Sequence, residues 1–399
     1  MKLVDRKLYL DRIKPFIGNS LIKVLVGMRR VGKSYLLKQI IDLIKIKYKI
    51  ENIIYINKED YVFDNIKNYT DLIEYVESCG EKNSPKALFI DEIQEIDQFE
   101  KALRHFQTKE YYDIYCTGSN SKLLAGEISS LLSGRFIQIK IHPLNYPEFL
   151  YFNELENSNE NFITYLKNGG MPHLSNLPSD SEIVREYHRN IYDSIILRDI
   201  VLRYKIRNIS FINDLSTYLA DSIGSLISAK KISDYLKSQK IDIPSKTIIE
   251  YISYLESTFL IEKVKRYDIV GKKLFEINDK YYFQDIGLRN LLIPFKQKDI
   301  SKIIENIVYN HLLSMAYKVT VGNIGDYEVD FIAEKNGSIT YIQVAYLIID
   351  DNTHQREFGN LLKIRDNWRK IVVSMDEMAN GLYQGIEHFE LKKFLLSFV

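Results

Sequence analysis

The chain has 399 residues, which is too long for one ordinary hydrophobic core and predicts two or three domains. Hydrophobic residues make up 46% and charged residues 27%, a balance that excludes extensive disorder. The 54 basic and 53 acidic residues leave a formal charge of +1, so contact with a polyanion depends on local patches.

Two cysteines, Cys79 and Cys116, belong to no C-x-x-C pair or His cluster. We therefore expect neither a disulfide nor a zinc site, and a reducing, cytoplasmic location. The first residues, MKLVDRKLYLDRIK, alternate charged and apolar side chains and lack the apolar stretch of a signal peptide. No window reaches the roughly 18 uncharged residues of a membrane helix, so we expect a soluble protein with no membrane partner.

Residues 1–145 alternate short apolar strands with helical segments. The expected strands are 21–26, 52–56, 87–90, 113–117 and 136–141, and the expected helices include 33–46 and 71–78. Strands that alternate with helices predict an α/β fold, with a buried parallel sheet and helices on both of its faces.

The stretch GMRRVGKS, residues 27–34, follows an apolar strand, opens a helix and matches the phosphate-binding pattern G-x-x-x-x-G-K-[ST]. Gly27 and Gly32 let the backbone curl, so that successive N–H groups point at the phosphates of ATP. We expect Lys33 to reach the β and γ oxygens and the Ser34 hydroxyl to bind Mg²⁺. The other loop positions expected to contact the nucleotide are Arg29, Arg30, Val31 and Tyr35.

The stretch ALFIDE, residues 87–92, is an apolar strand that ends in two acids. We expect Asp91 to hold Mg²⁺, directly or through water, and Glu92 to act on the attacking water as a general base. An acidic pair can also simply favour the positive end of a helix dipole. The phosphate loop upstream favours the catalytic interpretation.

The strand at 113–117 continues into TGSN, which brings Ser119 and Asn120 near the γ-phosphate if this strand neighbours the one ending in Asp91. Either side chain could orient the attacking water, and both residue types are also common in turns. The stretch LLSGRF then exposes Arg135 before the next strand. Arg135 is either an arginine finger for a neighbouring subunit's nucleotide or a surface arginine.

After residue 145 the pattern changes to helices, and we assign 146–209 to a helical lid or linker. Residues 210–292 predict a winged-helix-like module, with helices at 212–223, 229–239 and 246–258 and two strands, 261–266 and 273–277, joined through Gly271. The candidate recognition helix, 246–258, has one basic residue, Lys246, and two acidic ones.

The candidate wing is more basic than this helix. It carries Lys263, Lys265, Arg266, Lys272 and Lys273. These side chains could neutralise several phosphates of DNA, although charged hairpins are usually just soluble sheet edges.

Residues 293–399 predict a separate small α/β domain. A helix that carries Glu305 leads to strands at 328–333 and 340–345, a helix at 356–368 and a strand at 371–374.

Several stretches together resemble the prokaryotic AAA+ ATPase family close to the archaeal-type ATPases, whose C-terminal domain has no defined function. The ATPase part is carried by GMRRVGKS, LFIDEIQ, TGSNSKLL and LSGRF, and the remainder by PLNYPEFL, YLKNGGMP, ILRDIVLRY, EVDFIAEKNG and YIQVAYLI. The resemblance covers essentially the whole chain. It implies an ATPase that forms homo-oligomers and acts on DNA, with a winged-helix region and a restriction-nuclease-like terminal domain.

Nucleases of the PD-(D/E)xK class use a helix Glu, a strand Asp and an E-x-K strand to hold Mg²⁺ and support the attacking water. The matching positions are Glu305, Asp330, Gln343 and Ala345. The last two depart from the pattern, and Ala345 has no charge to position water. Lys335 or Arg356 could take over that role, or both could be surface charges. We therefore expect a catalytically degenerate domain that is retained for binding.

Two functions stay open from the sequence. The first is an ATP-driven machine that acts on DNA, and the second is a nucleotide switch that binds a protein partner. Because phosphate contacts release counterions, salt-dependent stimulation of hydrolysis by DNA separates the two.

Overall fold

The computed structural model describes residues 4–45, 47–81, 84–121, 132, 134–178, 180–274, 278–348, 350–377 and 379–398. The chain divides into two compact units. The first comprises Met1–His142 and Ser257–Phe259, and the second comprises Pro143–Glu256 and Leu260–Val399.

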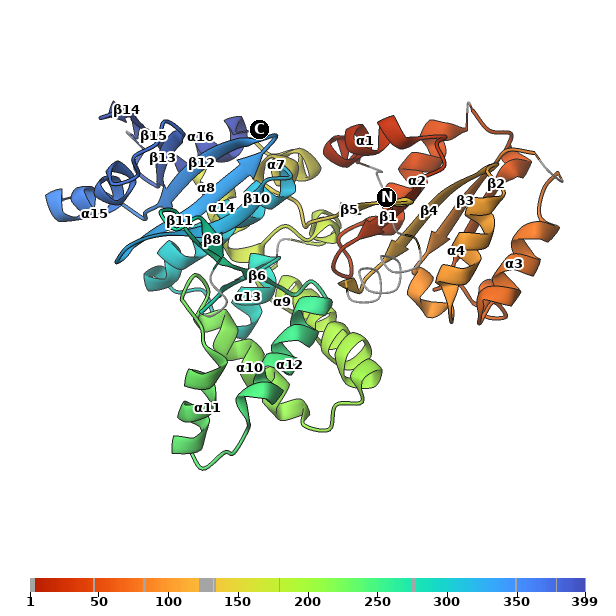
Figure 1. The fold of residues 1–399 in the computed structure, drawn as a ribbon, viewed down its shortest axis with the longest axis horizontal. Helices are drawn as coiled ribbons and strands as arrows, with labels where there is room; N and C mark the ends of the chain where they lie inside the picture. The colour runs from red at the N-terminus through yellow and green to blue at the C-terminus, as the bar shows by residue number, and fades with distance from the viewer. Residues whose placement is uncertain are drawn as a thin grey trace. The chain divides into compact units, whose positions relative to one another are not determined.

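The first unit is built on a five-stranded, wholly parallel sheet with the strand order β2-β3-β4-β1-β5 and helices on both faces (Figure 1). The strands are β1 (Ile22–Val26), β2 (Ile53–Asn57), β3 (Lys86–Asp91), β4 (Tyr112–Gly118) and β5 (Phe136–Lys140). The helices are α1 (Lys7–Ile13), α2 (Lys33–Ile44), α3 (Tyr69–Ser78) and α4 (Phe99–Thr108). The predicted α/β fold with a parallel sheet is confirmed.

Strands β1, β3 and β4 are buried along their whole length, which explains why they read as continuous apolar runs instead of alternating ones. Two of the charged exceptions, Lys23 and Asp113, pair with each other. The Lys23 ammonium lies against the Asp113 carboxylate, and Asp113 also accepts a hydrogen bond of 3.0 Å from the Tyr48 hydroxyl. A buried charge is tolerated here because it has a partner of opposite sign.

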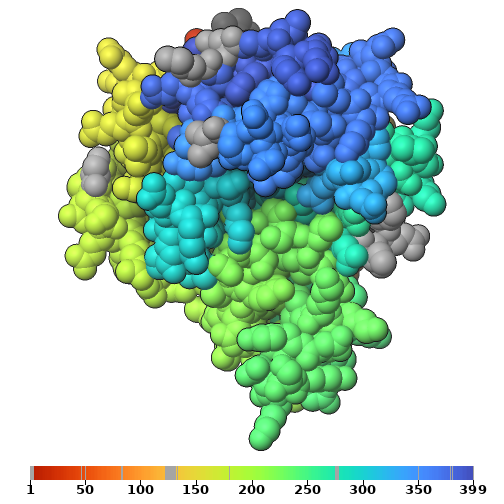
Figure 2. Space-filling view, turned by 90° about the vertical axis from the view of Figure 1, so that its left-hand side faces the viewer, coloured from red at the N-terminus to blue at the C-terminus, as the bar shows by residue number. Residues whose placement is uncertain are grey.

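The second unit starts with helices and ends in a large sheet. Its helical segments are α7 (Tyr146–Asn153), α8 (Asn159–Asn168), α9 (Ser181–Ser194), the π-helical segment Ile195–Leu202, α10 (Ile209–Asp221), α11 (Ala229–Ser238), α12 (Ser245–Ser257), α13 (Ile286–Leu292), α14 (Ile300–Ser314), α15 (Asp351–Leu362) and α16 (Leu391–Ser397). The green region of Figure 2, which includes the residues of α11, projects away from the blue C-terminal residues.

The large sheet of the second unit has eight strands in the order β14-β15-β13-β12-β11-β10-β7-β8. These are β7 (Arg266–Asp268), β8 (Lys273–Leu274), β10 (Lys318–Ile324), β11 (Tyr327–Lys335), β12 (Ser338–Val344), β13 (Arg369–Ser374), β14 (Asn380–Tyr383) and β15 (Ile386–Glu390). Helix α15 packs on this sheet, where Phe358 and Leu361 join a buried apolar cluster with Tyr341 of β12 and Val372 of β13.

The expected hairpin between 261–266 and 273–277 is wrong in its pairing. The first range splits into β6 (Ile261–Val264), which pairs with β9 (Lys280–Phe283), and β7, which pairs with β8 and runs parallel to β10. The backbone N–H of Ile269 donates to the Asn323 carbonyl at 2.9 Å, so β7 is hydrogen-bonded into the large sheet. Of the basic residues assigned to a wing, Lys265, Arg266, Lys272 and Lys273 therefore lie along the edge of the C-terminal sheet, whereas Lys263 lies on β6 in the two-stranded sheet with β9. Residues 275–277 lie outside the described residues.

The helix expected at 356–368 is displaced toward the N-terminus. Helix α15 begins after Asp350, whose carboxylate caps it by accepting the Thr353 N–H at 2.8 Å, and it ends at Leu362. Residues 363–368 instead form the connection to β13. An N-cap aspartate satisfies an otherwise unpaired amide of the first turn, and this fixes where the helix starts.

The NGG of YLKNGGMP has a packing explanation within the second unit. The Gly170 N–H donates to Asp285 Oδ2 at 2.8 Å, and the Leu144 N–H donates to the Gly170 carbonyl at 2.7 Å. A Cβ atom on Gly170 would lie 2.1 Å from the Leu144 carbonyl oxygen. Only glycine allows two backbone segments to approach this closely.

Among the described residues, no helix combines the length and apolar character that crossing a bilayer requires.

Candidate nucleotide site

The loop between β1 and α2 has the backbone of a phosphate cradle. Gly27 and Gly32 have φ values of 156° and 95°, and Arg30 between them adopts a φ of 67°. A Cβ atom on Gly27 would lie 2.3 Å from the Ile141 carbonyl oxygen, so the loop also requires glycine for space. Gly32 is the N-cap of α2 and has no side chain to occupy the first amides of that helix, which remain directed at the loop.

The Lys33 side chain is folded back onto this loop. Its Nζ atom donates to the carbonyl oxygens of Gly27 and Met28 at 3.0 Å each and lies 3.6 Å from Glu92 Oε1. The side chain is only 4% exposed. A buried ammonium therefore stands between the loop backbone and a carboxylate.

The carboxyl ends of β1, β3 and β4 lie at the same edge of the sheet. The register pairs Val26 of β1 with Gly118 of β4, and Ile90 of β3 with Cys116 of β4. Since the strands are parallel, the residues that follow them lie next to one another. The phosphate loop after β1 and the acidic pair at the end of β3 thus flank the end of β4.

Thr117 at the end of β4 holds the acidic pair in place. Its hydroxyl donates to Asp91 Oδ1 and accepts the Glu92 N–H at 2.9 Å. The Tyr55 hydroxyl donates to the other Asp91 oxygen at 3.3 Å. Asp91 is thereby oriented by hydroxyl groups from both neighbouring strands.

Glu92 is buried, and its backbone adopts the left-handed conformation with a φ of 54°. Burial alone would raise the pKa of its carboxyl, but the Lys33 ammonium and a hydrogen bond from Gln94 outweigh burial and lower the pKa below its ordinary value. Gln94 Nε2 donates to Glu92 Oε2 and also to Ser119 Oγ, the latter at 3.3 Å. Glu92 is therefore an ionised carboxylate at neutral pH, linked through Gln94 to the end of β4.

The structure places Gly27, Gly32, Lys33 and Ser34 on the loop and the first turn of α2. It brings Asp91, Glu92, Ser119 and Asn120 to the same edge, and Asn120 next to Ser119 is fully buried. Arg29 Nη1 lies 3.6 Å from Glu59 Oε1, and Tyr35 on α2 is 42% exposed.

Arg135 lies apart from this group. It is exposed and immediately precedes β5, whose first residue pairs with Ile22 at the start of β1. The Ile22 N–H donates to the Arg135 carbonyl at 3.0 Å. Arg135 therefore lies at the amino ends of the strands, whereas the phosphate loop lies at their carboxyl ends. At about 3.3 Å per residue, the two are roughly 13–17 Å apart along the strand direction. Residues 122–131 and 133, within TGSNSKLL and LLSGRF, lie outside the described residues.

Three site residues were missed by the sequence analysis. Thr117 and Gln94 lie inside the quoted motifs TGSN and LFIDEIQ, so their position could have drawn attention to them. Arg6 carries no such signal: its guanidinium donates to the carbonyl oxygens of Val31 at 3.1 Å and His142 at 3.1 and 3.2 Å. It fixes the phosphate loop from the N-terminal segment.

The second unit gathers the residues compared above with a nuclease centre. Glu305 from α14, Asp330 from β11 and Gln343 from β12 converge; Gln343 Oε1 accepts the Asp330 N–H at 3.4 Å, and Asp330 Oδ2 accepts the Val344 N–H at 2.8 Å. Lys335 instead lies over the Tyr317 ring, and Arg356 pairs with Glu357.

A lysine that the sequence analysis did not consider stands between these acids. Lys280 of β9 has its Nζ atom 3.0 Å from Glu305 Oε1, 2.7 Å from Glu328 Oε1 and 3.8 Å from Asp330 Oδ1. Burial would lower the pKa of Lys280, but the charges of the three carboxylates raise it overall. Among the described residues, no group of three or more His, Cys, Asp or Glu side chains is placed to hold a metal ion.

The parallel sheet, the phosphate loop after β1 and the acidic pair after β3 define an AAA-type P-loop ATPase domain. Residues 19–150 match the family described as AAA domain. The fold is similar to that of a Walker-type ATPase of Pyrococcus abyssi, with a TM-score of 0.52 and 17% identity, over 73% of this chain and 96% of that one. Residues 159–299 match a domain of unknown function, DUF8612.

Two relatives match most of the chain. An uncharacterised protein of Haemophilus influenzae is 36% identical over 400 residues, which is 99% of each chain. An uncharacterised protein of Methanocaldococcus jannaschii is 34% identical over 349 residues, covering 83% of this chain and 76% of that protein. The chain belongs to the family of these proteins.

Proposed function

We propose that the first unit binds ATP with Mg²⁺ and hydrolyses it. The observation that carries this proposal is the meeting of a lysine and an ionised carboxylate at one sheet edge, with 3.6 Å between Lys33 Nζ and Glu92 Oε1. In the proposed mechanism Lys33 turns from the loop carbonyls to the β and γ phosphates. The Ser34 hydroxyl and Asp91 would supply the oxygen ligands that Mg²⁺ prefers.

In this mechanism the ion would polarise the phosphates, and the chain itself handles the water. Glu92 accepts the proton of the attacking water, because its lowered pKa keeps the carboxylate free. Thr117 and Gln94 hold the two acids in their orientations. Ser119 or Asn120 orients the water from the end of β4, as expected from the sequence.

Two isosteric or truncating substitutions test the site. Glu92→Gln should keep ATP binding and lower kcat by roughly 10²- to 10⁴-fold, the usual contribution of a general base. Lys33→Ala should weaken ATP binding about 10- to 150-fold, since it removes charge-assisted hydrogen bonds of about 1.5–3 kcal/mol. The matched controls are the exposed Glu95→Gln and Lys38→Ala. Binding of a fluorescent ATP analogue and phosphate release are measured; normal turnover by Glu92→Gln would remove the proposed base.

We further propose that the active form is a homo-oligomer in which Arg135 reaches the nucleotide of a neighbouring subunit. Its position at the far edge of the sheet favours this, because Arg135 is too distant to act on its own chain's phosphates. Arg135→Ala should then be inactive alone and recover activity when mixed with Lys33→Ala protein. Absence of any recovery in the mixture argues against a finger acting across subunits.

The third part of the proposal is that ATP turnover is coupled to DNA binding by the rest of the chain. We propose the divisions 146–209 for a lid, 210–292 for a winged-helix-like module and 293–399 for a nuclease-like domain, with β7 and β8 shared between the last two.

Cleavage of DNA by the nuclease-like domain is not expected. The Lys280 ammonium occupies the space between Glu305 and Asp330 that a catalytic divalent cation would need.

DNA coupling is tested by measuring hydrolysis against added DNA at several salt concentrations. Stimulation that falls steeply with salt supports it, because phosphate contacts release counterions. If no form of DNA binds or changes the rate, the alternative function, a nucleotide switch for a protein partner, takes its place. The cytoplasmic location stays a prediction from the sequence.

A further inference from the structure

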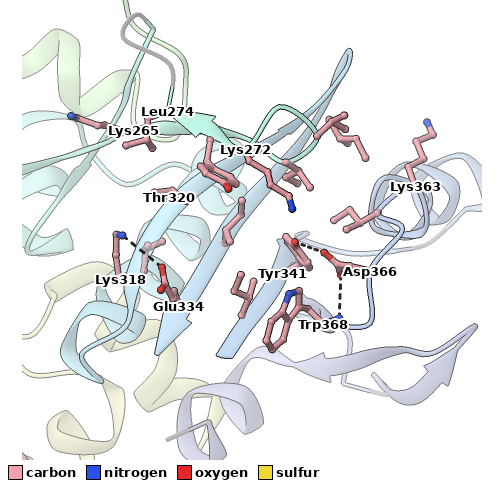
Figure 3. A pocket seen from close by; sticks show the side chains of 18 of the residues that line it. Lys265, Lys272, Leu274, Lys318, Thr320, Glu334, Tyr341, Lys363, Asp366 and Trp368 are labelled. Atoms are coloured by element: carbon pink, nitrogen blue, oxygen red, sulfur yellow. Dashed lines mark hydrogen bonds and ion pairs between the residues drawn. The ribbon is translucent and has the colours of Figure 1, made fainter. Parts of the chain in front are cut away.

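The C-terminal sheet carries a groove of about 1170 Å³ that no part of the nucleotide site uses (Figure 3). Its floor is the face of the sheet formed by Ile332, Tyr341 and neighbouring apolar side chains, with Ile364 beside them. One wall is the β7–β8 turn, and the other is the connection from α15 to β13, residues 363–368. We call this the basic groove.

The basic groove has a charge balance unlike that of the whole chain. It is lined by two acidic side chains, Glu334 and Asp366, and by six basic ones: Lys263, Lys265, Lys272, Lys318, Lys363 and Arg365. The 54 basic and 53 acidic residues of the chain nearly cancel, so this excess is a local feature. A polyanion is the ligand that such a patch attracts.

The two acids of the groove are already engaged. Glu334 pairs with Lys318 at 3.6 Å, and Asp366 accepts the Tyr341 hydroxyl at 2.7 Å and lies 3.5 Å from Lys370 Nζ. In contrast, the side chains of Lys265, Lys272 and Arg365 make no hydrogen bond or ion pair with another described residue. The groove therefore holds cations without counter-charges, spread from its Lys265 end to its Lys363 end in Figure 3.

The groove also offers an aromatic surface. Trp368, the chain's single tryptophan, is 42% exposed and lines the groove together with Tyr267 and Tyr341. Its backbone N–H donates to Asp366 Oδ1 at 3.1 Å, which holds the backbone of this connection. A partly exposed indole beside cations without counter-charges can stack on a base while the neighbouring phosphates are neutralised.

We infer that the basic groove binds a single-stranded nucleic acid, with its phosphates on Lys265, Lys272 and the cations of 363–365, and a base on Trp368. This inference deepens the DNA-coupling part of the proposed function and rests on it. A duplex keeps its base faces stacked inside and offers none to Trp368. A protein partner fits less well, because lysine is depleted where protein interfaces are buried. The volume exceeds the roughly 300–1,000 Å³ of most small-molecule pockets.

The test is fluorescence anisotropy of the full chain with labelled 12-nucleotide single-stranded DNA, the same sequence as RNA, and a matched duplex, from low to moderate salt. We expect both single strands to bind more tightly than the duplex. Lys265→Gln/Lys272→Gln should weaken binding and reduce the slope of log affinity against log salt by about 1.4, since each phosphate contributes about 0.7 for a single strand. Trp368→Ala should weaken binding roughly 5- to 150-fold and leave that slope unchanged.

The matched controls lie on α11, outside the groove. Lys230→Gln/Lys237→Gln removes two exposed lysines, and Tyr235→Ala removes an aromatic ring that is 61% exposed. Both should bind single strands like the unaltered chain. Thermal melting and ATP turnover of each variant verify that the fold is intact.

Three outcomes overturn the inference, and they differ from failure of the proposed function. If the α11 variants lose binding and the groove variants do not, DNA coupling stands and the groove is the wrong site. If the duplex binds as tightly as the single strands and Trp368→Ala has no effect, the ligand class is wrong. If no nucleic acid binds at low salt, both the groove and DNA coupling fail, while ATP hydrolysis is judged separately from the Glu92→Gln result.

Discussion

Replacement of Lys280 by methionine removes the cation that lies among Glu305, Glu328 and Asp330 while keeping the length of the side chain. Glu305 and Asp330 would then face each other without a counter-charge, and Glu328, 34% exposed, could turn to water. Burial and the Glu305 charge already raise the pKa of Asp330, which shows that the ionised form of this carboxyl is unfavourable even with Lys280 present. Removing one partner of a buried ion pair costs about 3–5 kcal/mol, and we expect this loss at pH 7.

The loss should depend on pH with a definite sign. In Lys280→Met a carboxyl of the folded chain has a pKa above its unfolded value, so the folded state binds the extra proton. The variant therefore regains stability as pH falls from 7 toward the ordinary glutamate pKa of about 4.3, by about 1.4 kcal/mol per pH unit. Glu305→Gln added to Lys280→Met should recover part of the loss at pH 7, because it removes one of the repelling charges.

The chain provides its own reporter for this measurement. Trp368 is its single tryptophan and lies in the same unit as Lys280, so urea unfolding followed by tryptophan fluorescence reads the unit in question. The control is Lys263→Met, whose partner Asp279 lies at 2.6 Å but whose side chain is 37% exposed. An exposed pair contributes about 1 kcal/mol or less. Equal losses in the two variants, or a Lys280→Met loss that does not change with pH, would refute the reasoning.

Three further substitutions follow from other contacts. Burial lowers the pKa of His311 to about 4, so the folded chain keeps the imidazole neutral. The resulting contribution to stability is full above pH 6.5 and falls by up to roughly 3 kcal/mol toward pH 4. His311→Phe should therefore flatten that part of the curve of urea midpoint against pH. Gly170→Ala should destabilise by about 1–3 kcal/mol in urea unfolding, through its clash with a carbonyl, whereas Gly359→Ala on α15, with open space around it, should be neutral or slightly stabilising. Thr117→Val should lower ATP turnover about 10- to 100-fold, because Asp91 loses an orienting hydroxyl. It should also lower the free energy of unfolding by about 1–3 kcal/mol, because the buried Glu92 N–H loses its acceptor; unchanged turnover would show that Thr117 is dispensable for hydrolysis.

The parallel sheet and the phosphate loop were predictable because their signals are local. A buried parallel strand is an unbroken apolar run, and the loop requires glycines at fixed spacing before a lysine. Thr117, two residues before the predicted Ser119, shows the limit of such signals. Its hydrogen bonds to Asp91 and Glu92 depend on β3 and β4 being neighbours, and sequence spacing does not contain strand order.

The C-terminal part was harder to predict because its key contacts join distant segments. Lys280 was assigned by its position in the chain to the winged-helix-like module, and nothing in its local sequence indicates that it meets Glu305, Glu328 and Asp330. The pairing of β7 with β10 is likewise a long-range contact, between residues 266–268 and 321–323. A charged hairpin and an added sheet strand have the same local pattern, and only the partner strand separates them.

The acidic centre and the basic groove share a face of one strand. Ile339, Tyr341 and Gln343 alternate along β12 and therefore point to the same side of the sheet; the first two line the groove, and Gln343 accepts a hydrogen bond from Asp330 in the acidic centre. Three uncompensated carboxylates close to the groove would repel the phosphates that its cations attract. Lys280 thus has two consequences in this arrangement. It stabilises carboxylates that could not otherwise remain buried as anions. It also compensates their negative charge, so that the electrostatic potential in the groove stays positive.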